Sequence, residues 1–166
     1  RILLNIGGIG NFTYLPANQD PNLILVTDTG PGNTLIDACV RTHFPGFFFD
    51  KDARLGMQGV LHTGLLKALM NLDFFKEDFP KSTGPEYFNL NKVEQLIQAN
   101  QWTLTPTDLI RTLTEFSAQS MALAIKKYIP ETQANLYVSG GGSQNPLLMQ
   151  RISELLPEIK MGFSSE

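Results

Sequence analysis

Short apolar runs separated by polar turns occupy the first part of the chain. The runs at residues 2–6, 12–15 and 23–27 have the length and composition of β-strands. The glycine-rich turn between the first two predicts a hairpin, and the stretch at residues 16–22, rich in Pro and Asn, predicts a connecting turn. The pattern therefore predicts a chain that begins with three antiparallel strands.

Apolar residues three and four positions apart dominate the middle of the chain, which is the spacing of amphipathic helices. Asn33 precedes the first of these segments and Thr107 begins the longest, so each is expected to cap a helix. The predicted helices cover residues 34–42, 59–72, 91–100 and 107–128.

A buried strand at residues 135–139, a helix from Pro146 and a last strand at residues 159–161 complete the pattern. The order predicts an α/β fold with a mixed sheet, in which three antiparallel strands precede parallel ones. Helices are expected on both faces of the sheet, with a helical insert before the fourth strand. At 166 residues, the chain suits one domain, 1–166, with a sizeable core.

Charge and composition bear on which partners and which cellular location are expected for this chain. The net charge is -3 and the basic residues are scattered, which argues against nucleic acid as the main partner. Cys39 is the only cysteine, so no internal disulfide can form. No apolar run has membrane-spanning length and no signal peptide is visible, so no membrane partner is expected and a cytoplasmic location is the default. Arg1 is not an initiator methionine and an apolar strand follows it at once, while the chain stops just after another short apolar segment. Both ends are therefore expected to be truncated.

Two glycine-rich loops carry the candidate chemistry. The first is Asn5-Ile6-Gly7-Gly8-Ile9-Gly10-Asn11, and the second is Asp28-Thr29-Gly30-Pro31-Gly32-Asn33. Glycine lets backbone N–H groups approach an anion closely, and Asp28, expected at the tip of its strand, would face the first loop. A phosphate cradle beside a general base indicates phosphoryl transfer. The alternatives are a plain hairpin turn and a helix-capping Asp28.

A third loop, Gly140-Gly141-Gly142-Ser143-Gln144-Asn145-Pro146, joins a predicted strand to a helix. Ligands bind at this position in α/β sheets, and a helix start offers free N–H donors. The loop matches neither the dinucleotide fingerprint nor a Walker loop. A bare tight turn is the alternative to a binding role.

Other polar residues have weaker signals. Lys81 is a candidate for neutralising phosphate, with Ser82 and Thr83 as hydrogen-bond donors, although a solvated loop explains them as well. No metal-ligand spacing is present, so no metal site is expected from protein ligands alone. Three further carboxylates, Asp37, Asp50 and Asp52, are candidates for supporting the site. Helix capping and helical charge pairs explain Asp108, Arg111 and Glu115. The aromatic run Phe47, Phe48 and Phe49 is expected to pack in the core or in an interface.

Five segments, at residues 4–13, 28–33, 81–84, 111–116 and 140–149, resemble the anhydro-N-acetylmuramic acid kinases in that family's order. They extend over nearly the whole chain, which makes the resemblance far more specific than a single glycine loop. The family belongs to the sugar kinases and actin-like ATPases, whose members have two ribonuclease-H-like lobes with the nucleotide between them. The resemblance implies that this chain is mainly the second, C-terminal lobe.

The resemblance also implies a reaction and its site. With ATP and Mg²⁺, water would open the anhydro sugar and the freed oxygen would take the γ-phosphoryl group, giving N-acetylmuramic acid 6-phosphate in peptidoglycan recycling. Asp28 would be the general base, and residues 140–145 would hold the adenosine part. The implied nucleotide and phosphate contacts are Asn5, Gly7, Gly8, Gly10, Asn11, Gly30, Gly32, Asn33, Gly140, Gly141, Gly142 and Asn145, with Thr29, Lys81, Ser82 and Thr83 as further substrate or phosphate contacts.

Two departures from the family pattern matter. The family's first phosphate loop lies N-terminal to this chain, so the missing lobe of the same protein is an expected partner and the isolated chain is expected to be inactive. Pro85 stands where the family usually has arginine. The oligomeric state is open, a homodimer included. Alternative functions are another sugar or carboxylate kinase of the superfamily, or a non-catalytic lobe for binding or assembly.

Overall fold

The sheet of the computed structural model, which describes residues 1–129 and 134–163, has five strands in the order β3-β2-β1-β4-β5. β1 pairs antiparallel with β2, which pairs antiparallel with β3, whereas β1, β4 and β5 are parallel. This confirms the expected mixed sheet. The strands are β1 (Ile2–Ile6), β2 (Ile9–Tyr14), β3 (Leu25–Pro31), β4 (Asn135–Ser139) and β5 (Lys160–Phe163).

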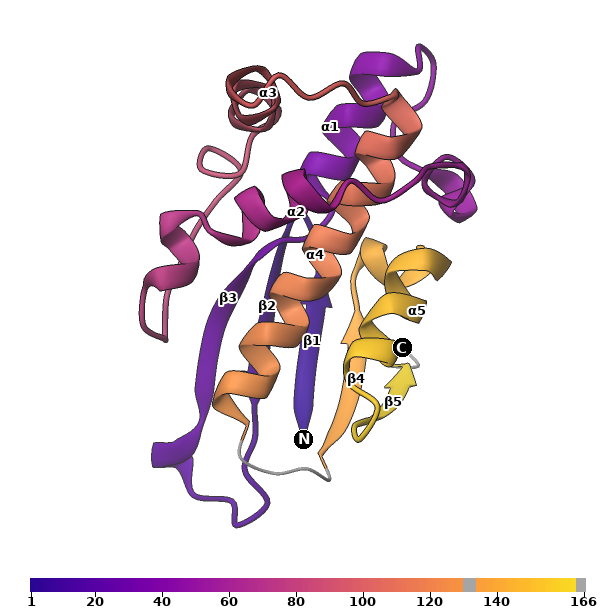
Figure 1. Cartoon of the computed structure of the whole chain (residues 1–166). Helices are drawn as coiled ribbons and strands as arrows, with labels where there is room; N and C mark the ends of the chain where they lie inside the picture. Colours follow the sequence, from indigo (N-terminus) through magenta and orange to yellow (C-terminus); the bar gives the residue numbers. More distant parts are fainter. Residues whose placement is uncertain (130–133, 164–166) are drawn as a thin grey trace.

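Five helices accompany the sheet within the described residues. Figure 1 shows α4 running along one face of the sheet with α5 beside it, while α1, α2 and α3 gather at the end of the sheet away from the N-terminus. The helices are α1 (Thr34–His43), α2 (Thr63–Met70), α3 (Leu90–Ala99), α4 (Pro106–Tyr128) and α5 (Pro146–Leu155).

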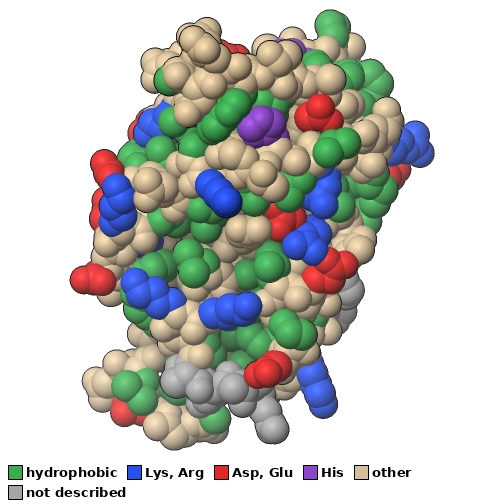
Figure 2. Space-filling model, viewed as in Figure 1, with side chains coloured by type: hydrophobic (Ala, Val, Ile, Leu, Met, Phe, Trp, Pro, Cys, Tyr) green, Lys and Arg blue, Asp and Glu red, His purple; other side chains and the backbone are tan. Residues whose placement is uncertain are grey.

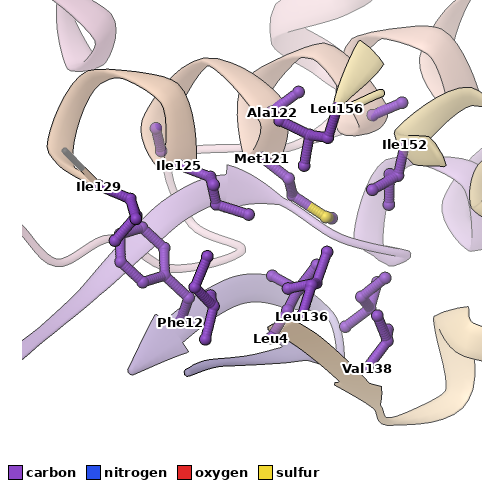
Figure 3. Close-up of a cluster of buried hydrophobic side chains, with 14 of the residues drawn as sticks. Leu4, Phe12, Met121, Ala122, Ile125, Ile129, Leu136, Val138, Ile152 and Leu156 are labelled. Atoms are coloured by element: carbon purple, nitrogen blue, oxygen red, sulfur yellow. The ribbon is translucent and has the colours of Figure 1, made fainter. Parts of the chain in front are cut away.

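Strand periodicity places the main core on one face of the sheet. Residues of β1 alternate between buried and exposed, and its buried side chains pack under α4 and α5 (Figure 3). Leu3 and Asn5 point to the opposite face and are exposed. The described helices therefore cover one face, which corrects the expectation of helices on both faces, and the open face is free to carry a site.

A second core forms where the insert packs on the N-terminal half of α4. Apolar residues of α1, α2 and α3 join Leu109, Leu113 and Phe116 there, which confirms the helical insert. Cys39 lies in this cluster, and burial, reinforced by the negative charge of Glu94, raises the pKa of its thiol to about 12. The cysteine is therefore a core residue, as expected.

Several element boundaries differ from those expected. Pro21–Leu23 forms a 3-10 turn that Asp20 caps, and β3 then continues to Pro31, so Asp28 lies inside the strand and not at its tip. The helix expected at residues 59–72 is shorter because His62 caps its start.

The caps also differ. Thr105, not Thr107, accepts a hydrogen bond from the Asp108 N–H at the start of α4. Asn33 makes no side-chain cap on α1. The run Phe47–Phe49 is 58%, 72% and 56% exposed, so it does not join the core.

A buried ion pair joins α4 to α5. Glu115 is 1% exposed and accepts hydrogen bonds from Arg151 Nε at 2.7 Å and Nη2 at 3.0 Å, with Gln119 as a further donor. Arg111 lies 3.5 Å away in an i,i+4 pair. The expected helical charge pair is present, but the main partner comes from another helix. Burial opposes ionisation of Glu115, yet these hydrogen bonds and charges leave its pKa lowered.

We expect Glu115→Gln to lower the free energy of unfolding by about 1–2 kcal/mol at neutral pH, since it removes the charge that pairs with Arg151 while that arginine keeps some water contact. A lowered native pKa stabilises the protein above the ordinary value of 4.5 and loses that effect as pH falls through the native pKa. Urea unfolding at neutral pH measures the loss of unfolding free energy, and urea unfolding below pH 4.5 measures how far that difference between variant and wild type disappears. The control is Glu94→Gln, at an exposed position of α3. Equal losses for the two variants at neutral pH would contradict the prediction.

Candidate functional site

A row of polar residues crosses the open face of the sheet. Asn5 pairs with Asn11 in the register of β1 and β2, Asn11 pairs with Asp28 in β3, and Asn5 also pairs with Ser139 in β4. Paired residues share a face of the sheet, so all four lie opposite the helices. Two strand spacings place Asp28 about 10 Å from Asn5. Side chains from distant parts of the chain therefore meet on one surface.

The two glycine loops dock on each other through their backbones. The N–H groups of Gly32 and Thr34 donate to the Gly8 carbonyl at 2.8 and 3.1 Å, and the Asn33 N–H donates to the Gly7 carbonyl at 2.8 Å. A Cβ on Gly32 would collide with the Gly7 carbonyl oxygen and lie 3.2 Å from its carbon. Gly32 is therefore required by this contact.

Gly7 and Gly8 have a different environment from Gly32. The nearest atoms to a Cβ on either would be 3.7 and 3.9 Å away, an ordinary contact distance. Packing alone does not require glycine at these two positions. The backbone there is open and lies beside the polar row. Thr29 is 1% exposed and donates to the Gly10 carbonyl at 3.0 Å, so its hydroxyl binds the neighbouring strand. Gly30 has φ +131°, a conformation that favours glycine.

The third loop abuts the first two. Gly140 has φ +85°, and a Cβ there would lie 2.6 Å from the Ile6 carbonyl oxygen and 2.7 Å from Asn5 Oδ1. Gly142 packs on Ile6 and faces the side chain of Asn33. The three predicted loops thus come together at one end of the sheet. Asn33, expected as a helix cap, lies instead between α1 and the third loop.

A pocket of about 510 Å³ opens beside this junction, within the range typical of small-molecule sites. Asn145 is 9% exposed at its wall, where its side chain accepts a hydrogen bond from the Leu148 N–H at 3.0 Å and caps α5. Gly141 is exposed next to it. The other lining residues are Asn33, Ile36, Asp37, Arg41, Phe48, Phe49, Asp50, Lys51, Asp52 and Gln144, so the expected supporting carboxylates Asp37, Asp50 and Asp52 all lie at this pocket.

Sequence reasoning singled out six of the twelve residues that line this pocket, namely Asn33, Asp37, Asp50, Asp52, Gly141 and Asn145, but not its aromatic wall. Phe48 and Phe49 were expected in a core or interface, and Arg41 had no assigned role. The i,i+4 spacing of Asp37 and Arg41 was a usable signal, since it places both on one side of α1. Burial raises the pKa of Asp37, and the charge of Arg41 opposes this rise. Nothing local in the sequence shows that the aromatic run comes back to the Gly141 loop.

Asp28 meets the segment at residues 81–83 along the outer edge of β3. Its Oδ2 accepts a hydrogen bond from the Thr83 N–H at 2.8 Å, and its own N–H donates to the Lys81 carbonyl at 3.0 Å. Ser82 is exposed between them and Thr83 is half-buried. The structure thus joins two motifs that lie more than fifty residues apart in the sequence.

The Lys81 side chain points away from solvent. It is 9% exposed, and its ammonium donates to the Phe74 carbonyl and, at 3.4 Å, to the Glu77 carbonyl. The nitrogen also lies 4.0 Å from the centre of the Phe74 ring and 4.3 Å from that of Phe79. The ammonium therefore has internal partners, which differs from the expected direct phosphate contact.

Charge elsewhere is dispersed. Figure 2 shows lysines and arginines interspersed with acidic residues over the face that carries α4. Asp50, one of the expected supporting carboxylates, is buried and accepts the N–H groups of Leu55 and Gly56 at 2.8 and 2.9 Å. In the described part of the chain, no three His, Cys, Asp or Glu side chains gather to hold a metal ion. Nor does any described helix combine the length and hydropathy that a membrane crossing needs.

Asp52 lies at the wall of the 510 Å³ pocket, and Pro85 is not among the residues that line it. Pro85 is exposed, and Asp52 is an exposed residue whose ion pair with Arg54 measures 3.5 Å. Asp108 accepts the Val60 N–H at 2.7 Å, so it ties α4 to the insert as well as binding at the helix start. Of these three residues, Asp108 is the one whose contact supports the fold around the site.

Comparisons with known proteins identify the family. Anhydro-N-acetylmuramic acid kinases from Pseudoalteromonas atlantica and Pseudoalteromonas translucida are 46% and 42% identical over 96% and 99% of this chain, which spans 40% and 41% of their lengths. Among solved structures, the activator of 2-hydroxyisocaproyl-CoA dehydratase from Clostridium difficile with bound ADPNP is similar at 16% sequence identity and a TM-score of 0.49. The match covers 98% of this chain and 53% of the activator chain, and it is too weak to bear on function. The profile of the anhydro-N-acetylmuramic acid kinase family matches residues 1–166, and the chain therefore belongs to that family.

Proposed function

We propose that this chain is the C-terminal lobe of a longer ATP-dependent kinase that opens anhydro-N-acetylmuramic acid and phosphorylates it, giving N-acetylmuramic acid 6-phosphate in peptidoglycan recycling. The observation that carries the proposal is the family match over residues 1–166. Its curated relatives are more than twice as long, which supports a second lobe outside this chain.

Asp28 is the proposed general base. Its carboxylate lies on the open face of the sheet, in register with Asn11, which in turn pairs with Asn5. Water attacks the anomeric carbon and gives a proton to Asp28, while the bond from that carbon to the bridging sugar oxygen breaks. The freed oxygen bonds to the γ-phosphorus of ATP, and ADP leaves. A positioned carboxylate suits this step because water is a poor nucleophile.

The open loops are the proposed nucleotide site. The backbone at Gly7 and Gly8, with Asn5 and Asn11, would contact phosphate oxygens, and the pocket beside Gly141 has the volume for the adenosine part. Gly10, Gly30, Gly32, Gly140 and Gly142 would hold the loop shapes that such contacts need, as Asn33, Thr29 and Asn145 would through their internal hydrogen bonds or packing.

Magnesium fits this site as a companion of ATP. Mg²⁺ usually binds through one or two carboxylates, water and substrate phosphates, so it needs no dedicated cluster of protein ligands. The ATP phosphates and water would hold the ion, which leaves Asp28 free as the base, and when bound the ion would neutralise charge on the phosphates. A cytoplasmic location fits the use of ATP, and neither nucleic acid nor a membrane is a proposed partner. A homodimer is compatible with the proposal, whose site lies within one chain.

The test is an ATP-consumption assay of the full-length protein with anhydro-N-acetylmuramic acid, followed by mass analysis of the product. We expect a ring-opened, phosphorylated sugar, and no turnover by the isolated 166-residue chain, which lacks the partner lobe. Nucleotide binding without turnover would indicate a different sugar or carboxylate substrate. Neither binding nor turnover would favour a non-catalytic assembly lobe.

A further inference from the structure

Thr27 joins the Lys81 backbone to β3 directly beside Asp28. Its hydroxyl accepts a hydrogen bond from the Lys81 N–H at 3.0 Å and lies 3.1 Å from the Lys81 carbonyl oxygen, to which it can donate. Thr27 is 4% exposed, on the helix-covered side of the strand. These bonds continue the ladder in which the Asp28 N–H binds the same carbonyl and the Thr83 N–H binds the Asp28 carboxylate.

The side chain of Lys81 fixes the other side of this segment. Its ammonium binds two carbonyl oxygens, of Phe74 and Glu77, and lies over the rings of Phe74 and Phe79. Cation–π contacts strengthen when the cation is removed from water. Burial lowers the pKa of Lys81, and Glu77 opposes this effect. A lysine is costly to bury unless its partners compensate, so the geometry indicates a role beyond solvation of a loop.

We propose that Lys81 is a positioning residue for the base: its buried ammonium anchors residues 81–83 to residues 74–79, and this holds the Thr83 N–H on Asp28 Oδ2. With Oδ2 held, the plane of the carboxylate is fixed and Oδ1 is the oxygen presented to the attacking water. Lys81 acts through the backbone and touches neither substrate nor nucleotide. The inference rests on the proposed function, because it says how the carboxylate that acts as the base is oriented toward the attacking water.

The first test is Lys81→Met in the full-length protein, which keeps an apolar stem and removes the ammonium. We expect kcat to fall about 10–100-fold, the cost of a base displaced by about 1 Å, with KM for ATP unchanged. Lys127→Met is the matched control, because Lys127 also lies near the Phe79 ring, at 5.9 Å, but makes none of the anchoring contacts. An unchanged kcat for Lys81→Met would overturn the proposal, and a raised KM for ATP with normal kcat would indicate a direct phosphate contact.

Thr27 provides a second route to the same result. Thr27→Val keeps the shape and removes the hydroxyl, so its kcat is expected to fall by a similar factor, whereas Thr27→Ser keeps the hydroxyl and should retain activity. The double variant with Lys81→Met should lose little more than either single variant, because both changes release one segment. Fully additive losses in log kcat would contradict the shared route. If Lys81→Met does not fold, the two Thr27 variants decide the question.

A readout independent of turnover separates this inference from the proposed function. Selective ¹⁵N-threonine labelling of the full-length protein follows the Thr83 amide, whose proton binds a carboxylate and should resonate downfield. Lys81→Met should shift it upfield, and Lys127→Met should not. Absence of sugar kinase activity in the wild-type protein would defeat the proposed function while this shift still tests the anchor. An unmoved Thr83 amide in Lys81→Met would overturn the anchor itself.

Discussion

Replacing Asp28 with asparagine lowers kcat of the full-length protein about a thousandfold or more, the upper range for removal of a positioned general base. Asparagine has the same shape and can still accept the Thr83 hydrogen bond, so the fold and nucleotide affinity should be unchanged. The measurement is kcat at saturating ATP and anhydro sugar, with nucleotide affinity determined separately. A loss of activity without a loss of binding would place the defect in the chemical step.

The control for this variant is Asp20→Asn. Asp20 caps the 3-10 turn before β3 through the Asn22 N–H, and asparagine caps such turns as well. It should leave both kcat and nucleotide affinity near those of the wild type. If Asp28→Asn keeps more than a tenth of the wild-type rate, another group is the base and the proposed chemistry fails.

Gly32→Ala has the largest expected effect on stability. Its Cβ would collide with the Gly7 carbonyl, which is backbone and cannot rotate away, so the two loops must separate. We expect a loss of about 3 kcal/mol, at the upper end of costs for overpacking. Hydrogen exchange followed by mass spectrometry should show lost protection at the Gly32, Asn33 and Thr34 amides, which bind the Gly7 and Gly8 carbonyls.

Gly141→Ala is the matched control in the third loop. A Cβ there would be 3.7 Å from the nearest atom, in Asn33, so the change should be neutral or stabilising by a few tenths of a kcal/mol. Retained protection at residues 32–34 in Gly32→Ala would show that the loops do not depend on their backbone contact.

Local sequence predicted the strands and the long helix well, because each follows a regular apolar period. β1 is a short apolar run ahead of a glycine-rich turn, and α4 carries an apolar stripe over six turns, so both were visible without tertiary information. Errors arose at the ends of elements, where tertiary packing and not the local apolar period decides whether a strand or helix continues. β3 continues through Gly30 and Pro31 because β2 pairs with it there, whereas glycine and proline locally predict its end.

The candidate site was predictable in part for the same reason. Glycine clusters located all three loops, since positions such as Gly30, Gly32 and Gly140 need a backbone conformation or a close approach that a Cβ would oppose. The meeting of Asp28 with Thr83 depends on a segment inside the insert, between α2 and α3, and no local pattern predicts its return to β3. The Lys81 side chain was expected to face a ligand because lysines usually reach water. Its aromatic surroundings come from Phe74 and Phe79, which precede it by only seven and two residues, but no periodic pattern shows that this short segment folds back over the ammonium.

The segment at residues 81–83 has a consequence for self-association. β3 is one of the two edge strands of the sheet, and an edge strand with unpaired backbone groups is a template for another chain. The hydrogen bond from the Asp28 N–H to the Lys81 carbonyl occupies part of that edge, and the Lys81 N–H donates to the Thr27 hydroxyl beside it. The contacts that hold the carboxylate thus also block intermolecular strand pairing, so loosening them would expose an edge prone to aggregation.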